Sequence, residues 1–489
     1  MKGLRFLIGL MLLSVTMVSF ADDKESKELK KLHSAVAKAM KEKASQKDAA
    51  SAEKLAEAVF AAHPEETGSA HYYLGEMYAR TDSKDVEDYP KAMSYLRQSL
   101  QELASDSKWR GYANYNIGFI YSKGGAVPQN FDSAYVYYEK AQELDKTFVV
   151  GYAKLLEFGM GVDKDLPASL IAYGEGIQAG KDLYMPFFGL KYAMEHIQNG
   201  DIDMEAFDKY QLGISESEFG SMEKYAKYVK EAADAGYLPA LAEWGTIVYN
   251  GTTGVDGNKE EGVRYLKKAA DAGYLPALHN YATLYFMWKV YSSGVGGVLK
   301  GKQVQKDMIP YYEKAAQGGF PPAEYAMGNT YLNGLGVDVD QIKAYKWLSL
   351  SAKHGYAAAK EMLKQVKIKD EDKAIVNQEV EKSPDLIAQV SDLINNFNKN
   401  DLFVGTKAST TAEKEQKLGK TSVAEEGALN ADFFQSQYNK YGRRVEKELK
   451  AESPRADYIA SMQKKMKEYA DAAAEKGFTI QRNEFETAK

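Results

Sequence analysis

The sequence predicts an all-α protein built from a repeated helical hairpin, because one short segment recurs almost unchanged along the chain. Residues 231–240 read EAADAGYLPA and residues 268–277 read KAADAGYLPA, so nine of ten positions match at an offset of 37. Two looser copies follow, KAAQGGFPPA at 314–323 and LSAKHGYAAA at 350–359. Each copy lies within the same flanking pattern, which indicates a repeat architecture. A single hairpin cannot bury its apolar face alone, whereas stacked hairpins bury it against their neighbours.

The first helix of each unit shows a fixed order of residue types. A small residue is followed four positions later by an apolar residue, then directly by Gly or Ala, and three positions after that usually by Tyr. These spacings place the residues on one helix face, where the small residue allows a neighbouring helix to approach and Tyr fills the next layer. The units are Ala70, Leu74, Gly75 and Tyr78; Ala113, Ile117, Gly118 and Tyr121; Ala277, Tyr281, Ala282 and Tyr285; and Ala323, Met327, Gly328 and Tyr331.

A glycine-containing turn separates this helix from a second one. Gly161, Gly254 and Gly336 each precede Val, and glycine there supplies the positive φ that ends a helix at low steric cost. The second helix carries an aromatic–apolar pair followed by small residues. It ends in successive units at Gly236, Gly273, Gly319 and Gly355.

The N-terminus has the three-part order of a secretory signal. Lys2 and Arg5 precede an apolar run over 6–20, and small residues lead to a predicted cleavage after Ala21. The run is shorter than the roughly 20 apolar residues that a membrane span requires. We therefore expect residues 1–21 to be a signal peptide and the mature chain to be periplasmic, with release to the extracellular space as the alternative.

The flanks of the repeats differ from them in composition. Residues 67–368 are predicted to form the helical-repeat solenoid. Residues 22–66 are rich in Lys, Glu and Ala and are predicted to be capping helices, since terminal repeats need a polar outer face. Beyond the repeats, the sequence predicts a helical extension over 369–403 with a break near Ser383-Pro384, a flexible linker over 404–430 and a C-terminal helical tail over 431–489.

Composition excludes several classes of protein. The formal net charge is −6 with acidic and basic residues intermixed, which is unlike a nucleic-acid binder with its basic domain or stripe. The chain has no Cys, so disulfides, thiolate metal sites and a Cys nucleophile are absent. No stretch after the N-terminal run is long and apolar enough to span a membrane. Tyr is frequent, at 35 residues, but most Tyr occupy repeat positions assigned to packing.

The repeat pattern resembles the Sel-one-like repeat, a relative of the tetratricopeptide repeat. Its clearest copy is GLGVDVDQIKAYKWLSLSAKHG at 334–355, and the resemblance is strong over about 221–360 and looser over 70–145. It is weak over 146–220. The resemblance implies a right-handed α-solenoid of seven or eight repeats with a concave protein-binding face. It also implies roles in assembling complexes, including bacterial envelope and secretion machinery.

One insertion interrupts the repeat spacing and is the predicted binding site. The offset of 46 exceeds the later offset of 36 by ten residues, and the excess falls around 288–306. Insertions in repeat proteins map to loops that often lie on a binding face, and Trp and Tyr are favoured interface anchors. The candidate protein-binding residues are Trp288, Tyr291, Lys300 and Lys302. The alternative is that Trp288 merely packs against the end of a lengthened helix.

No catalytic, cofactor or metal site is predicted. The segment GGVLKGK at 296–302 has phosphate-loop spacing, but Gln303 stands where a Ser or Thr should hold magnesium, and no strand precedes it. None of the six His pairs at a metal-ligand spacing, and His279 is expected to have a surface or capping role.

The sequence therefore predicts a non-catalytic periplasmic scaffold or adaptor that binds one or more proteins. One alternative is a cell-wall or polysaccharide factor, either a glycan binder or a hydrolase accessory. Another is an exported virulence factor that binds a host protein.

Overall fold

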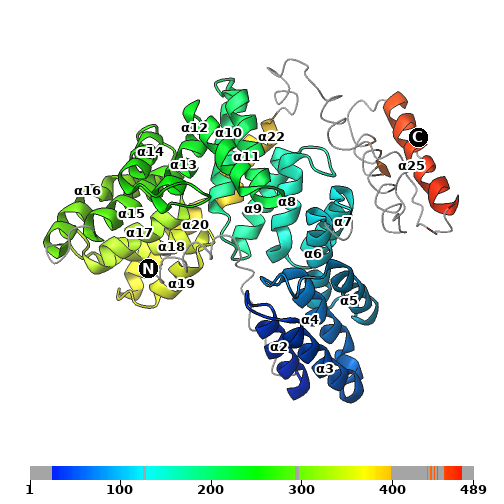
Figure 1. Ribbon diagram of the computed structural model, residues 1–489. Helices are drawn as coiled ribbons and strands as arrows, with labels where there is room; N and C mark the ends of the chain where they lie inside the picture. The colour runs from blue at the N-terminus through cyan, green and yellow to red at the C-terminus, as the bar shows by residue number, and fades with distance from the viewer. Residues whose placement is uncertain are drawn as a thin grey trace. The chain divides into compact units, whose positions relative to one another are not determined.

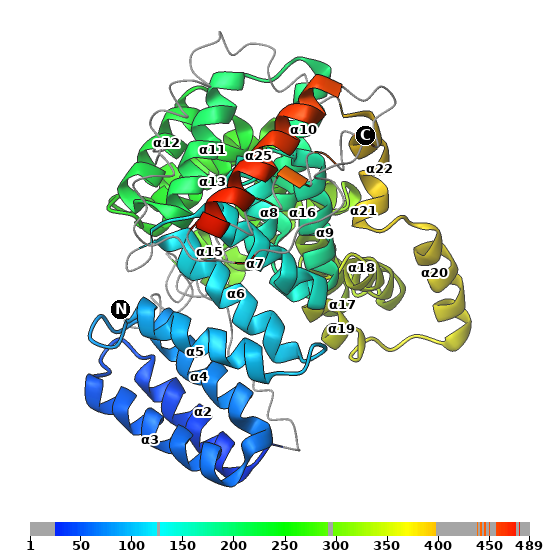
Figure 2. The same ribbon diagram turned by 90° about the vertical axis from the view of Figure 1, so that its right-hand side faces the viewer.

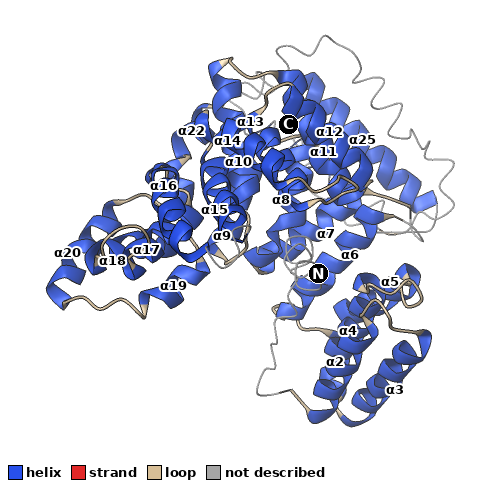
Figure 3. Cartoon of the chain, turned by 60° about the vertical axis from the view of Figure 1, so that its left-hand side comes forward, coloured by secondary structure: helices blue, strands red, loops and turns tan. Residues whose placement is uncertain are grey.

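The computed structural model describes residues 25–124, 128–291, 297–397 and 456–475, together with 438, 441, 442, 445, 449 and 479. The predicted signal peptide 1–21, its cleavage after Ala21 and the linker 404–430 lie outside these residues. Across the described residues all regular structure is helical, which confirms the predicted fold class (Figures 1 and 3).

The described residues divide into two compact units near the end of α6. The first contains residues up to 120 with 124 and 128, and the second contains 121–123 and everything from 129 onward. The helices of the first unit carry the blue to light-blue colours of Figure 2. They are α2 (Lys27–Ala39), α3 (Gln46–Ala62), the short η1 (Pro64–Glu66), α4 (Thr67–Arg80), α5 (Tyr89–Glu102) and most of α6 (Lys108–Lys123).

The first unit surrounds one buried helix, α4. The hairpin of α2 and α3 precedes it and packs on it, and α5 pairs with it as the second helix of a repeat. Ser26 caps α2 and donates its backbone N–H to the Glu66 carboxylate at 2.8 Å, which joins the start of the hairpin to its end. Ser45 and Asp48 form a capping box at the start of α3. These contacts fix the two helices at the N-terminal end of the repeats.

The Gly at the predicted Gly-or-Ala position of the first helix allows close packing in two hairpins, α4–α5 and the hairpin over 321–353. A Cβ atom added at Gly75 would lie 2.6 Å from Leu96 on the partner helix, and one at Gly328 would lie 2.5 Å from Leu348. Leu96 and Leu348 are both fully buried. Glycine therefore leaves the space that the Leu of the second helix fills in these two repeats.

The second unit continues the alternation of paired helices, with one exception. α8 pairs with α9, α11 with α12, α13 with α14, α15 with α16, and α17 with α18, whereas α10 stands between two pairs. The bounds are α7 (Phe131–Leu144), η2 (Lys146–Phe148), α8 (Val149–Phe158), α9 (Leu166–Gln178), α10 (Tyr184–Asn199), α11 (Met204–Phe219), α12 (Met222–Asp234), α13 (Leu238–Asn250), α14 (Lys259–Asp271), α15 (Leu275–Tyr291), α16 (Gly297–Gln317), α17 (Pro321–Asn333), α18 (Gln341–Lys353), α19 (Ala357–Leu363), α20 (Asp370–Lys382), α21 (Leu386–Gln389) and α22 (Ser391–Asn396).

Four successive second helices, α12, α14, α16 and α18, end in the same Schellman turn. Gly236 has φ +91°, its N–H bonds Ala233 O at 2.9 Å, and the N–H of Tyr237 bonds Ala232 O at 3.1 Å. The same pair of bonds recurs with aromatic residues Tyr274, Phe320 and Tyr356 after Gly273, Gly319 and Gly355. We call Tyr237, Tyr274, Phe320 and Tyr356 the aromatic row. The same turn thus places an aromatic residue directly after the terminal Gly of four successive second helices.

Helices far apart in the sequence meet within the second unit. The backbone of Ile177 at the end of α9 lies so close to Gly355 that a Cβ there would be 2.7 Å from Ile177 O. The amide of Gln178 donates to Lys353 O at 3.5 Å. Helix α21 also packs on α9, where Ile387 fills the space beside Gly174. The end of the repeats therefore folds back against α9.

The described residues beyond the repeats form further helices. Helix α20 ends at Lys382 before Ser383 and Pro384, the predicted break. Helix α25 (Ala456–Glu475) lies within the predicted tail. Its apolar side belongs to a separate cluster with residues of 438–449: Tyr438, Val445, Ile459, Met466 and Ala470.

Candidate functional site

The predicted insertion is helical on both sides of 292–296, the part that lies outside the described residues. Helix α15 has 17 residues and α16 has 21, whereas α13 and α14 have 13 each. The extra residues therefore extend two helices, and the loop that repeat spacing predicts over 288–306 is wrong for 288–291 and 297–306. The physical reason is that α15 and α16 continue to pair beyond the usual hairpin length.

Trp288 lies near the end of the lengthened α15 and is half-buried. Its ring meets Tyr285 edge-on at 6.1 Å, and the Lys289 ammonium lies 3.8 Å from its centroid. This arrangement agrees with packing of a helix end, and the cation–π contact adds to it. Tyr291 ends α15, and Lys300 and Lys302 lie in the first turns of α16. Binding by these four residues stays a prediction.

Two histidines lie in unlike surroundings. His279 on α15 has the rings of Tyr312 and Phe320 at 5.7 and 5.6 Å, and burial lowers the pKa of its imidazole to about 4. His279 is half-buried, and the rings of Tyr312 and Phe320 lie over part of it. His196 at the end of α10 bonds Asp201 at 2.8 Å and stacks on Tyr192 at 4.1 Å.

A buried acid–base pair joins three parts of the second unit. The two oxygens of Glu324 on α17 lie 3.0 and 2.8 Å from His354 Nδ1, and the side chains of both residues are 2% exposed. His354 Nε2 lies 3.2 Å from both Pro384 O, an acceptor, and Gln389 Nε2, a donor, so Nε2 has a partner in either tautomer. Burial raises the pKa of Glu324, and the contact with His354 opposes that rise. The pair therefore links α17 to the end of α18 and ties Pro384 to the repeats.

A second buried carboxylate joins α8, α9 and α11. The Tyr173 hydroxyl donates to Glu157 at 2.6 Å, and the Gln211 amide donates to the other oxygen at 2.8 Å. Among the described residues Gln211 Oε1 is buried without a hydrogen-bond partner. Burial raises the pKa of Glu157, against the opposing effect of these two hydrogen bonds. A raised carboxyl pKa here reflects a structural network, since all three partners are buried.

We expect Glu157→Gln to gain stability relative to wild type as the pH rises. A raised carboxyl pKa means that the folded state binds the proton more tightly, so the stability of the wild type falls as pH rises from about 4.5 toward the folded pKa. The neutral amide lacks this dependence and can still accept the hydrogen bond from Tyr173. Urea unfolding of both proteins at pH 4 and pH 7 measures the difference in their free energies of unfolding. The same difference from wild type at both pH values would contradict this account.

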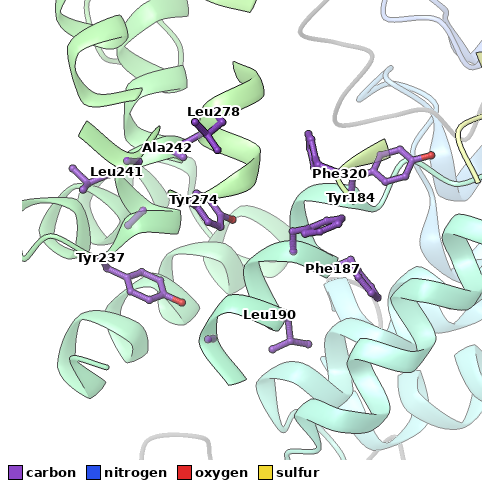
Figure 4. Close-up of a cluster of buried hydrophobic side chains, with 14 of the residues drawn as sticks. Tyr184, Phe187, Leu190, Tyr237, Leu241, Ala242, Tyr274, Leu278 and Phe320 are labelled. Carbon is purple, nitrogen blue, oxygen red and sulfur yellow. The ribbon is translucent and has the colours of Figure 1, made fainter. Parts of the chain in front are cut away.

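The aromatic row lies against α10. Tyr184 meets Tyr356 at 5.7 Å and Phe320 at 6.5 Å, and Phe188 meets Phe320 at 5.1 Å. Tyr192, one further turn along, meets Tyr274 at 5.5 Å and Tyr237 at 5.8 Å. Figure 4 shows Tyr184 beside Phe320, with Tyr274 and Tyr237 farther along the cluster. Sequence reasoning missed this contact, although three aromatic residues spaced by four were a signal for it.

A shallow groove runs beside this contact. It is lined by Phe188, Lys191, Glu195 and His196 of α10 and by 272–276 at the turn between α14 and α15. Lys191 and Glu195 pair at 3.4 Å, so the charges along the groove are largely compensated. The groove is mixed in character and indicates no single ligand chemistry.

In the described part of the chain, no three His, Asp or Glu side chains gather closely enough to hold a metal ion. None of the helices described is both long and apolar enough to cross a membrane.

Comparison with known families identifies the repeats. The model of the Sel1 repeat matches residues 68–101, 111–145, 238–274 and 321–356. The chain contains four Sel1 repeats. The matched segment 238–274 covers α13 and α14 and ends at Tyr274, and 321–356 covers α17 and α18 and ends at Tyr356. Both end residues belong to the aromatic row. The paired helices α11–α12 and α15–α16 lie outside the matches but keep the same packing.

Two solved structures are similar to this chain. One is c5321, a protective antigen of uropathogenic Escherichia coli strains with an SLR fold; it is 17% identical, with 77% of this chain and 84% of that chain covered and a TM-score of 0.29. The other is a Sel1 repeat protein from Oxalobacter formigenes; it is 20% identical, with 70% and 88% covered and a TM-score of 0.27. No curated protein sequence matches the chain.

Proposed function

We propose that this protein is a non-catalytic scaffold that binds other proteins in the periplasm, where it helps to assemble an envelope or secretion complex. The observation that carries the proposal is the Sel1 repeats themselves, since such repeats generally mediate protein–protein interaction. The buried carboxylates support it as well, because Glu157 and Glu324 are engaged in contacts that join helices. The N-terminal signal pattern supports the periplasmic location.

Fractionation and sequencing of the mature N-terminus test the location. We expect the protein in the periplasmic fraction with Asp22 as its first residue. Substitution of Ala21 by a bulky residue should slow cleavage, because signal peptidases require small residues there. A cytoplasmic protein that begins at Met1 would overturn the location, and a protein found only in the medium would favour the extracellular alternative.

Site-specific crosslinking tests the scaffold role. A photoreactive residue is placed in living cells at exposed positions of the second helices, such as Lys227 and Arg264, and at Trp288 in the insertion. We expect at least one position to capture the same protein repeatedly. The purified pair should then bind with a measurable dissociation constant. Turnover of a cell-wall substrate by the purified chain, abolished by one substitution, would overturn the non-catalytic assignment.

A further inference from the structure

Helix α10 departs from the repeat architecture. It lies between the α8–α9 and α11–α12 pairs and forms no repeat hairpin with α11. One side of α10 is buried toward its sequence neighbours, and Phe187 on that side lies beside Gly174 of α9. The other side carries Tyr184, Phe188 and Tyr192 at intervals of four residues. Such spacing places all three on one helix face.

That second side of α10 contacts four successive repeats through the aromatic row. The order is reversed: Tyr184 meets Phe320 and Tyr356, whereas Tyr192 meets Tyr237 and Tyr274. A step of four residues advances a helix by about 6 Å. Successive turns of α10 therefore place one aromatic ring each along the aromatic row, from Tyr356 toward Tyr237.

The contact is made almost entirely by apolar surface. Within the described residues, the one hydrogen bond between residues 221–363 and α10 is donated by Asn280 Nδ2 of α15 to Met185 Sδ of α10, at 4.0 Å. Rings that pack without directional polar partners accept other rings of similar shape. Gly180 and Gly200, with φ +88° and +72°, lie just beyond the two ends of α10, and no atom would crowd a Cβ at either position.

We propose that the aromatic row is a helix-binding face that α10 occupies in cis. The outside partner that this face fits is an amphipathic helix with an aromatic residue at every fourth position. Recognition of a helix through anchors at i and i+4 is a recurring mode of protein binding. Because α10 belongs to the same chain, its effective concentration at the aromatic row is high. In the wild-type protein α10 therefore outcompetes an outside helix for this face. This inference goes beyond the scaffold role, because it assigns a face and a class of ligand within one purified chain.

Hydrogen exchange on the wild-type protein is the first test. We expect the backbone amides of α10 to exchange faster than those of α13 and α15, because in the proposal α10 detaches from the aromatic row while the repeats stay folded. If the α10 amides exchange as slowly as those of α13 and α15, α10 is a permanent part of the core and the proposal is overturned.

Binding of a helix in trans is the second test. A labelled peptide of residues 182–201 is titrated into wild type and into the double variant Phe188→Ala/Tyr192→Ala. We expect the variant to bind at least tenfold more tightly than wild type. Gln198→Ala is the matched control, since Gln198 is exposed on α10, and it should behave as wild type. A peptide carrying Ala in place of its three aromatic residues should not bind.

A folded double variant that binds the peptide no better than wild type would overturn the proposal. If the double variant does not fold, the exchange rates of the wild type decide the question. Neither experiment uses a cellular partner, so failure here is distinguishable from failure of the scaffold role.

Discussion

Replacement of Glu324 by Ala is expected to lower the free energy of unfolding of the second unit by about 3–5 kcal/mol, the range for removing one member of a buried pair. The substitution leaves His354 buried with Nδ1 unpaired, while Nε2 still faces Pro384. It also removes the side chain that joins α17 to the end of α18. The effect is large because water cannot replace the lost partner at 2% exposure.

Glu324→Gln is the matched control. The amide can donate a hydrogen bond to a neutral Nδ1, so its loss should be closer to 1 kcal/mol. Urea unfolding followed by Trp fluorescence measures both variants. Replacing Trp109 by Phe in every protein removes the one Trp of the first unit, so the signal reports on Trp244, Trp288 and Trp347. Equal stability of the Ala and Gln variants would show that the pair adds nothing beyond side-chain volume.

Replacement of Gly355 by Ala is expected to destabilise the second unit by about 2–6 kcal/mol, the sum of backbone strain and overpacking. Gly355 has φ +90°, where Ala is strained. The added methyl group would also lie 2.7 Å from both Ile177 O and Ile177 Cγ2 on α9. Since one of these atoms belongs to the backbone, α9 itself must move.

Gly236→Ala separates these two effects. Gly236 lies in the same Schellman turn with φ +91°, but no atom lies within 4 Å of its Cβ position. We expect only the strain, about 1–3 kcal/mol. Urea unfolding gives both values, and hydrogen exchange should show faster exchange in α9 for Gly355→Ala alone. Similar losses for the two variants would mean that the contact with α9 contributes little.

The fold class was predictable because helix periodicity and helix ends are local properties. Gly236, Gly273, Gly319 and Gly355 all have the positive φ that the sequence predicts, and each ends its helix. The insertion was less predictable. Repeat spacing reports extra residues but not their conformation, and α15 and α16 use them to continue pairing.

The candidate sites depended on tertiary contacts and were mostly missed. Nothing near Glu324 in the sequence indicates that its carboxylate is buried. Nor does it indicate that the carboxylate pairs with His354, 30 residues later. The sequence predicts a surface or capping role for His279, and only the structure shows that Tyr312 of α16 and Phe320 before α17 lie against its ring. Burial of a polar side chain is set by its neighbours in space, which no local pattern encodes.

By itself, the sequence determined that this chain forms paired helices, that they repeat, and that the same glycine turn ends α12, α14, α16 and α18. Those features follow from φ preferences and from side-chain period, which act over a few residues. Only the tertiary structure decided that α10 leaves the alternation to cover the aromatic row, and that α9 meets the turn at Gly355. The reason is that both contacts join surfaces many residues apart, where total apolar burial, rather than local propensity, selects the partner.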